Sequence, residues 1–185
     1  GIVTSSIEAI SVFNNSTAAY TVDAALMPGV TNVYVNGGAN ATTVSGIDTL
    51  ANLHLISTSQ AATVTTTATA KAGTADEAII LSNGAAQAGA MTATYDGLEI
   101  INFNAAGTTG SATRSLTLAS ADLEKIVVTG DAAANVTANF VGAEFDTQTA
   151  TFDASAAGGS ITASVTKGAS ALAAVTMSAQ NDTLI

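Results

Sequence analysis

The sequence predicts an all-β protein, specifically a parallel β-solenoid of the β-helix type, in which short strands of successive coils stack on one another. Short runs rich in Val, Ile and Thr alternate with period two, which suits a pleated, half-buried surface. Hydrophobic residues make up 48 % of the chain but aromatic residues only 4 %, and Trp is absent. Such small core residues fit thin coils that each contact only their neighbours.

The expected strands are separated by turn clusters such as Asn36-Gly37-Gly38 and Gly130-Asp131, because Gly and Asn tolerate positive φ. An antiparallel β-sandwich is the alternative fold, since short strands with Gly-rich turns also fit it. Segment 74–81 fits either a turn of helix or a strand. The expected strands lie at 7–13, 20–22, 33–35, 53–56, 62–67, 98–103, 115–118, 123–128, 150–152 and 160–165.

An internal repeat divides the sequence into two similar halves. The segment 30–37 resembles 123–130, at an offset of 93 positions, and Ile7-Glu8 resembles Leu98-Glu99, at an offset of 91. Self-similarity of this kind is typical of repeat architectures. We therefore expect two units of strands, 1–90 and 91–185. A short motif of apolar, acidic, any and apolar residue also recurs, at 7–10, 47–50, 98–101 and 123–126.

The charge balance excludes several partners. Four Lys and Arg residues oppose fourteen Asp and Glu residues, which gives a net charge of −10. Nucleic acid and anionic membrane surfaces are therefore not expected as partners, and no uncharged apolar run is long enough to span a membrane. Divalent cations suit such a chain as counter-charges, although the acids also serve solubility. The recurring acids, for example Glu99 and Glu124, are either solvated or form a ladder of carboxylates for cations.

Catalytic residues are scarce, and we expect no enzyme. His54 is the only His and lies between two Leu residues, and Cys is absent. A polysaccharide-degrading enzyme would need a pair of acids in a groove, for which Asp122, Asp131 and Asp153 are the candidates. Thr63, Thr65 and Thr67 alternate on one strand face. Rows of Thr bind ice in some solenoids, but the sequence alone favours an ordinary solvent-facing strand.

A family resemblance begins at Gly97–Asn104 and continues through 116–118, 123–131 and 152–156. In the order and spacing of these pieces the chain resembles bacterial S-layer proteins of the calcium-binding RTX type. The resemblance implies type I secretion through an uncleaved C-terminal signal, an extracellular cell-surface location and calcium-dependent assembly. A full G-G-x-G-x-D-x-U-x nonapeptide is absent, although 180–185 looks like the tail of one. We expect the RTX region to lie beyond this segment, in a longer protein.

Four aspartates are the candidate calcium ligands. Asp131 and Asp182 follow Gly and Asn in turns, where one residue can offer side-chain and backbone oxygens together. Asp153 and Asp122, each beside an expected strand, come next. The competing interpretation is that these carboxylates only cap turns by accepting bonds from backbone N–H groups.

Two functions are compatible with these observations. The first is a structural protein of an extracellular surface layer or filament, which assembles through calcium-dependent contacts with copies of itself and contacts cell-surface polysaccharide. The alternative is an adhesin or biofilm-matrix module of a large type I-secreted protein.

Overall fold

A computed structural model describes residues 7–56, 60–73, 75–83, 91–95, 97–107, 111–120, 123–140, 150–167 and 172–185. The described residues form strands joined by turns and contain no helix, and every strand pairing among them is parallel. This confirms the all-β solenoid and rules out the antiparallel sandwich. Within these ranges there is no helix with the length and hydropathy needed to cross a membrane.

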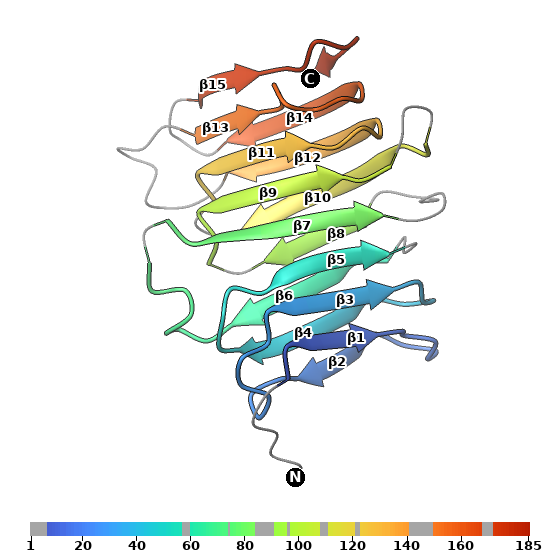
Figure 1. The fold of residues 1–185 in the computed structure, drawn as a ribbon, viewed down its shortest axis with the longest axis vertical. Helices are drawn as coiled ribbons and strands as arrows, with labels where there is room; N and C mark the ends of the chain where they lie inside the picture. The colour runs from blue at the N-terminus through green and yellow to red at the C-terminus, as the bar shows by residue number, and fades with distance from the viewer. Residues whose placement is uncertain are drawn as a thin grey trace.

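Two eight-stranded sheets face each other, and each coil contributes one strand to each sheet (Figure 1). Sheet A contains β1 (Ala9–Val12), β3 (Asn32–Asn36), β5 (Asn52–Ile56), β7 (Glu77–Asn83), β9 (Ile100–Ala105), β11 (Lys125–Thr129), β13 (Ala150–Asp153) and β15 (Leu172–Thr176). Sheet B contains β2 (Tyr20–Asp23), β4 (Thr42–Ile47), β6 (Ala62–Thr66), β8 (Met91–Tyr95), β10 (Arg114–Ser120), β12 (Ala134–Phe140), β14 (Ile161–Lys167) and β16 (Thr183–Leu184).

The length of a coil varies, because the turns differ while the strands stay in register. Asn32 pairs with Asn52, so that coil spans 20 residues, whereas Ala62 pairs with Ala93, 31 residues further on. Between β7 and β9 the pairing continues past position 90, with Ile80 beside Phe103. The described part of the chain is thus one continuous stack.

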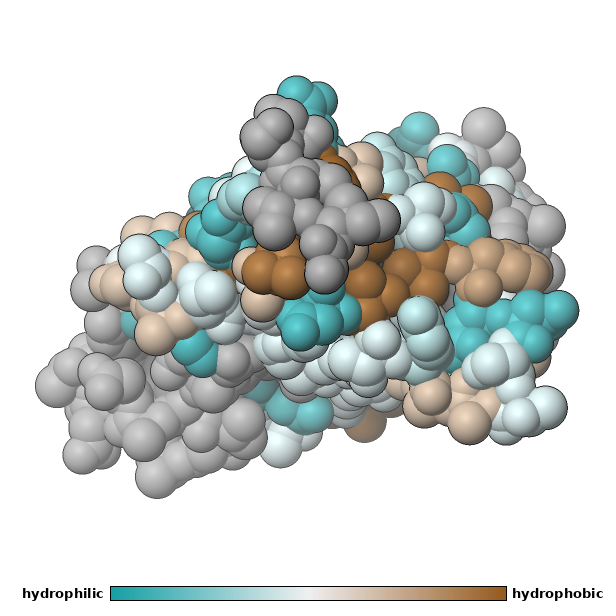
Figure 2. Space-filling view, turned by 90° about the horizontal axis from the view of Figure 1, so that it is seen from below, coloured by the Kyte–Doolittle hydropathy of each residue, from teal (hydrophilic) through white to brown (hydrophobic). Residues whose placement is uncertain are grey.

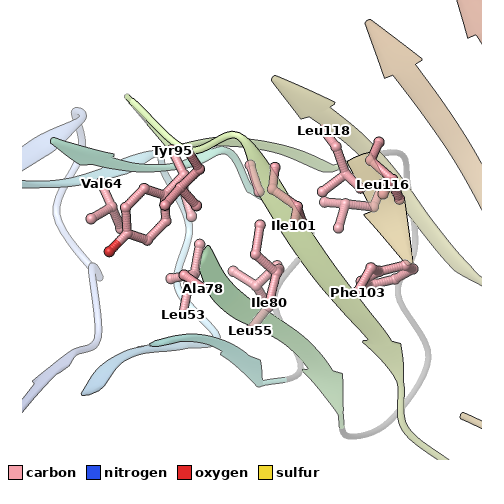
Figure 3. Packing of buried hydrophobic residues seen from close by; sticks show 14 of the residues in the cluster. Leu53, Leu55, Val64, Ala78, Ile80, Tyr95, Ile101, Phe103, Leu116 and Leu118 are labelled. Carbon is pink, nitrogen blue, oxygen red and sulfur yellow. The ribbon is translucent and has the colours of Figure 1, made fainter. Parts of the chain in front are cut away.

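The core is a thin layer of side chains between the two sheets. Alternate residues of each strand point inward, as in β3, where Val33 and Val35 are buried and their neighbours are half-buried. In Figure 3, Leu53, Leu55 and Ile80 from sheet A share this layer with residues of sheet B. Four of the few aromatic residues lie in this layer: Tyr95, Phe103, Phe140 and Phe152 are all fully buried.

Candidate functional site

Asp131 lies in the turn between β11 and β12, directly after Gly130. Gly130 has φ +95°, a left-handed conformation that favours glycine, and it forms a parallel bridge with Ala157 of the next coil. The Asp131 side chain is exposed, and its Oδ1 lies so close to Gly158 that a Cβ at that glycine would overlap it. Asp131 therefore contacts the adjacent coil.

Asp153 and Asp182 act as acceptors for backbone N–H groups. Asp153 ends β13, and its Oδ1 accepts a 3.0 Å bond from the amide of Ser155. The hydrogen bond from the Ser155 side chain, together with this amide bond, lowers the pKa of the carboxyl. The Oδ1 of Asp182 accepts a 2.7 Å bond from the amide of Ile161 in the preceding coil, and the Ser178 hydroxyl donates to both of its oxygens. Asp153 thus caps its own turn, as the competing interpretation proposed, whereas Asp182 caps the start of β14 in the preceding coil.

These three aspartates lie along one side of the solenoid, in the turns that lead from sheet A to sheet B on successive coils. They occupy different places along those turns, since Asp153 pairs with Val127, four positions before Asp131. Asp122 lies outside the described residues. Ca²⁺ prefers six to eight oxygen ligands, and the described residues contain no group of three Asp, Glu, His or Cys side chains placed to hold a metal. They do not by themselves fit a calcium site, and the calcium ligands stay a prediction.

Acidic residues do meet at the opposite side of the solenoid, where the chain enters sheet A. Asp76, Glu99 and Glu124 precede β7, β9 and β11, whose first residues pair in register. The Asp76 amide donates a 2.6 Å bond to Glu99 Oε2, and the carbonyl oxygens of Asp76 and Glu99 each accept two amide bonds from the next coil. Burial, together with the charge of Glu99, raises the pKa of Glu124.

This acidic row partly agrees with the recurring sequence motif. The motif placed Glu99 and Glu124 at equivalent positions, and the structure confirms that they are neighbours. Asp48, from another copy of the motif, lies in the turn after β4 and accepts a bond from the Gly29 amide at 3.1 Å. Asp76 belongs to the row although its surrounding sequence does not match the motif. The backbone groups of these residues belong to the ladder between coils, and the Glu99 side chain adds one further bond between coils.

A second polar group lies on the outward face of sheet A. Tyr34 and His54 are partners on neighbouring strands, and their rings stack with centroids 4.3 Å apart. His54 Nε2 forms a 3.0 Å hydrogen bond with Asn32 Oδ1, and partial burial lowers the pKa of His54. The sequence showed the single His but not this pairing, because the partners are 20 positions apart.

Comparisons of the chain with models of protein families, with curated proteins and with solved structures found no match.

Proposed function

We propose that this chain is a structural, non-enzymatic module of an extracellular surface layer or filament, built by contacts between copies of the solenoid. One observation carries the proposal: the two sheets run from β1 and β2 at one end to β15 and β16 at the other. Among the described residues, no strand pairs with the outer edges of these four strands. Open edges of this kind pair readily with another β-strand.

Both ends also carry exposed apolar side chains. Figure 2 looks onto the end where β1 and β2 lie and shows apolar surface at its centre. Phe13 and Leu26 in the first coil are 65 % and 54 % exposed, and Leu184 and Ile185 at the other end are 52 % and 76 % exposed. Stacking one end on the other is a head-to-tail contact, which does not close and therefore extends into a filament.

Charge is the reason to include calcium in the proposal. Copies with a net charge of −10 repel one another, and divalent cations between them relieve that repulsion. Of the candidate ligands, Asp182 lies directly before β16, at the end of the stack that a neighbouring copy would contact. The extracellular location, type I secretion and contact with cell-surface polysaccharide rest on the resemblance to RTX-type surface-layer proteins.

Sedimentation velocity tests the end-to-end contact. The 185-residue chain is expected to form large species at high concentration with calcium. Leu26→Lys places a charge at the end of the stack and should reduce assembly, whereas Ile79→Lys, on the outward side of β7 at 43 % exposure, is the matched control. Equal assembly by the two variants, or a monomeric parent chain, argues against the proposal.

Calorimetry tests the calcium part separately. Titration of the chain with CaCl₂ should release or absorb heat and raise the melting temperature, and Asp131→Asn and Asp182→Asn should weaken both effects. If the unmutated chain shows neither heat nor a thermal shift, calcium has no site in these residues, and assembly must proceed without it.

A further inference from the structure

The outward face of sheet B carries hydroxyl side chains in columns that run across successive coils. One column consists of Thr21, Thr43, Thr63 and Thr94, whose residues are paired in register from β2 to β8. A second column consists of Thr92, Thr117, Thr137 and Ser164, paired from β8 to β14. Beside it lies a third polar column, of Ser115, Asn135, Thr162 and Thr183, in which an amide takes the place of one hydroxyl. The sequence alone showed only one short row of Thr, because coils of unequal length hide the columns.

From β4 to β14 the strands of this face contain no acidic residue, although the chain is strongly acidic, and Asp23 at the end of β2 is an exposed acid at the edge of the face. Of their basic residues, Arg114 is buried and Lys167 ends β14. Sheet A differs, since Glu77, Lys125 and Asp153 belong to its strands. The outward face of sheet B between β4 and β14 thus carries few charges, which suits a neutral ligand.

The hydroxyl array is regular and stiff. Neighbouring strands lie about 4.8 Å apart, and alternate residues of a parallel strand about 6.6 Å apart, so the array has two fixed repeats. Thr is restricted at χ1 by its branched Cβ, and Thr63, Thr94, Thr117 and Thr137 are half-buried against their neighbours. The positions of the hydroxyl and methyl groups are therefore set before any ligand binds, which lowers the entropy lost on binding.

We propose that this face, the Thr face, binds the surface of crystalline water. A rigid, neutral lattice of hydroxyl and methyl groups is complementary to a ligand that is itself periodic, neutral and hydrogen-bonding. Ice has these properties, and its water molecules continue hydrogen bonds from rows of hydroxyl groups. A sugar polymer fits less well, because glycan-binding faces stack sugar rings on aromatic side chains, whereas the aromatic residues Tyr95 and Phe140 in these strands point into the core.

The test measures inhibition of ice recrystallisation by the whole chain and by two matched variants. Thr117→Lys places an ammonium in the middle of the Thr face, while Thr129→Lys makes the same change at a half-buried Thr on the outward face of sheet A. Activity should fall about tenfold or more in Thr117→Lys, since an unpaired charge held against a neutral lattice is costly. The Thr129→Lys variant should keep the parent activity.

Thr137→Lys is a second variant of the same column, for use if Thr117→Lys does not reach the parent melting temperature. A parent chain that leaves ice growth unchanged overturns the proposal. Equal loss in the Thr117 and Thr129 variants also overturns it, as does retention of activity in a folded Thr-face variant. A further outcome combines two results: the parent chain has no effect on ice, and Thr117→Lys abolishes association between copies in sedimentation. In that case the face is an assembly contact and the proposal is wrong.

Discussion

The Oη of Tyr95 donates a 2.7 Å hydrogen bond to the carbonyl oxygen of Ala51 inside the core, 44 positions earlier in the chain. Tyr95 is fully buried at the end of β8, and Ala51 is fully buried directly before β5. The bond ties a strand of sheet B to a turn of sheet A and satisfies a buried backbone acceptor.

Tyr95→Phe is therefore expected to lower the free energy of unfolding by roughly 1–3 kcal/mol, because the Ala51 carbonyl loses its partner in the core. Urea unfolding at neutral pH measures this. A loss below a few tenths of a kcal/mol would show that water replaces the hydroxyl.

Tyr95 also makes the free energy of unfolding depend on pH. Burial raises the pKa of Tyr95 above its ordinary value of 10.0. Above pH 10 the unfolded chain loses the phenolic proton while the folded chain keeps it, so stability falls as the pH rises. Unfolding curves between pH 8 and 11 should converge for the parent chain and Tyr95→Phe, and parallel curves would contradict the assignment.

Neighbouring isoleucines of β7 test the inward and outward alternation. Ile80 is fully buried and Ile79 is 43 % exposed. Ile80→Ala should lower the free energy of unfolding by about 2–5 kcal/mol, whereas Ile79→Ala should change it by about 0.5 kcal/mol or less. Similar losses in the two variants, by chemical denaturation, would place the strand in a different register.

Alanine substitutions at two glycines with positive φ distinguish the effect of backbone strain from the effect of steric crowding. Gly29 has φ +83° and open space around it, whereas a Cβ at Gly130, φ +95°, would overlap the carbonyl oxygen of Ala105. Gly29→Ala should be destabilising by about 1 kcal/mol through strain alone. Gly130→Ala should lower the melting temperature considerably more, and equal melting temperatures for the two variants would contradict the close packing of these coils.

The acidic row gives an electrostatic prediction. Glu124 has a raised pKa, so its charged form is disfavoured in the folded chain. The folded chain therefore holds this proton more tightly than the unfolded chain, and the free energy of unfolding falls as the pH rises and the carboxyl becomes charged. Glu124→Gln should raise the free energy of unfolding at pH 7 by only about 0.5 kcal/mol or less, because solvent screens this partly exposed side chain. The gain should shrink toward pH 4, and a gain that is independent of pH would exclude repulsion from Glu99.

The sequence predicted the fold class because strand runs such as 53–56 and 123–128 combine β-branched or Leu residues with flanking turn chemistry. It missed β4, β8, β12, β15 and β16. In β8 and β12 the inward residues include Ala93, Ala134 and Ala138, which contrast little with the outward Thr and Asn residues. Segment 77–83 is a strand rather than a helix, since Ala78 and Ile80 face the core while Glu77 and Ile79 are exposed.

The period of the repeat was only partly visible in the sequence. The offset of 93 positions separates Ile10 from Phe103, which lie in one core column through Val33, Leu53 and Ile80. The detected repeat is thus four coils long, and the single coil was hidden because turn lengths vary. For the same reason, the sequence could not show that Glu99 and Glu124 stack while Asp48 does not.

Electron microscopy of the concentrated chain, with calcium and with a chelator, tests the proposed structural role most directly. With calcium, we expect filaments or sheets in which the strands lie across the stacking direction and repeat about every 4.8 Å along it. With chelator, these assemblies should shorten or disappear. Single particles of one solenoid each, at the highest concentration and with calcium present, would contradict the proposal.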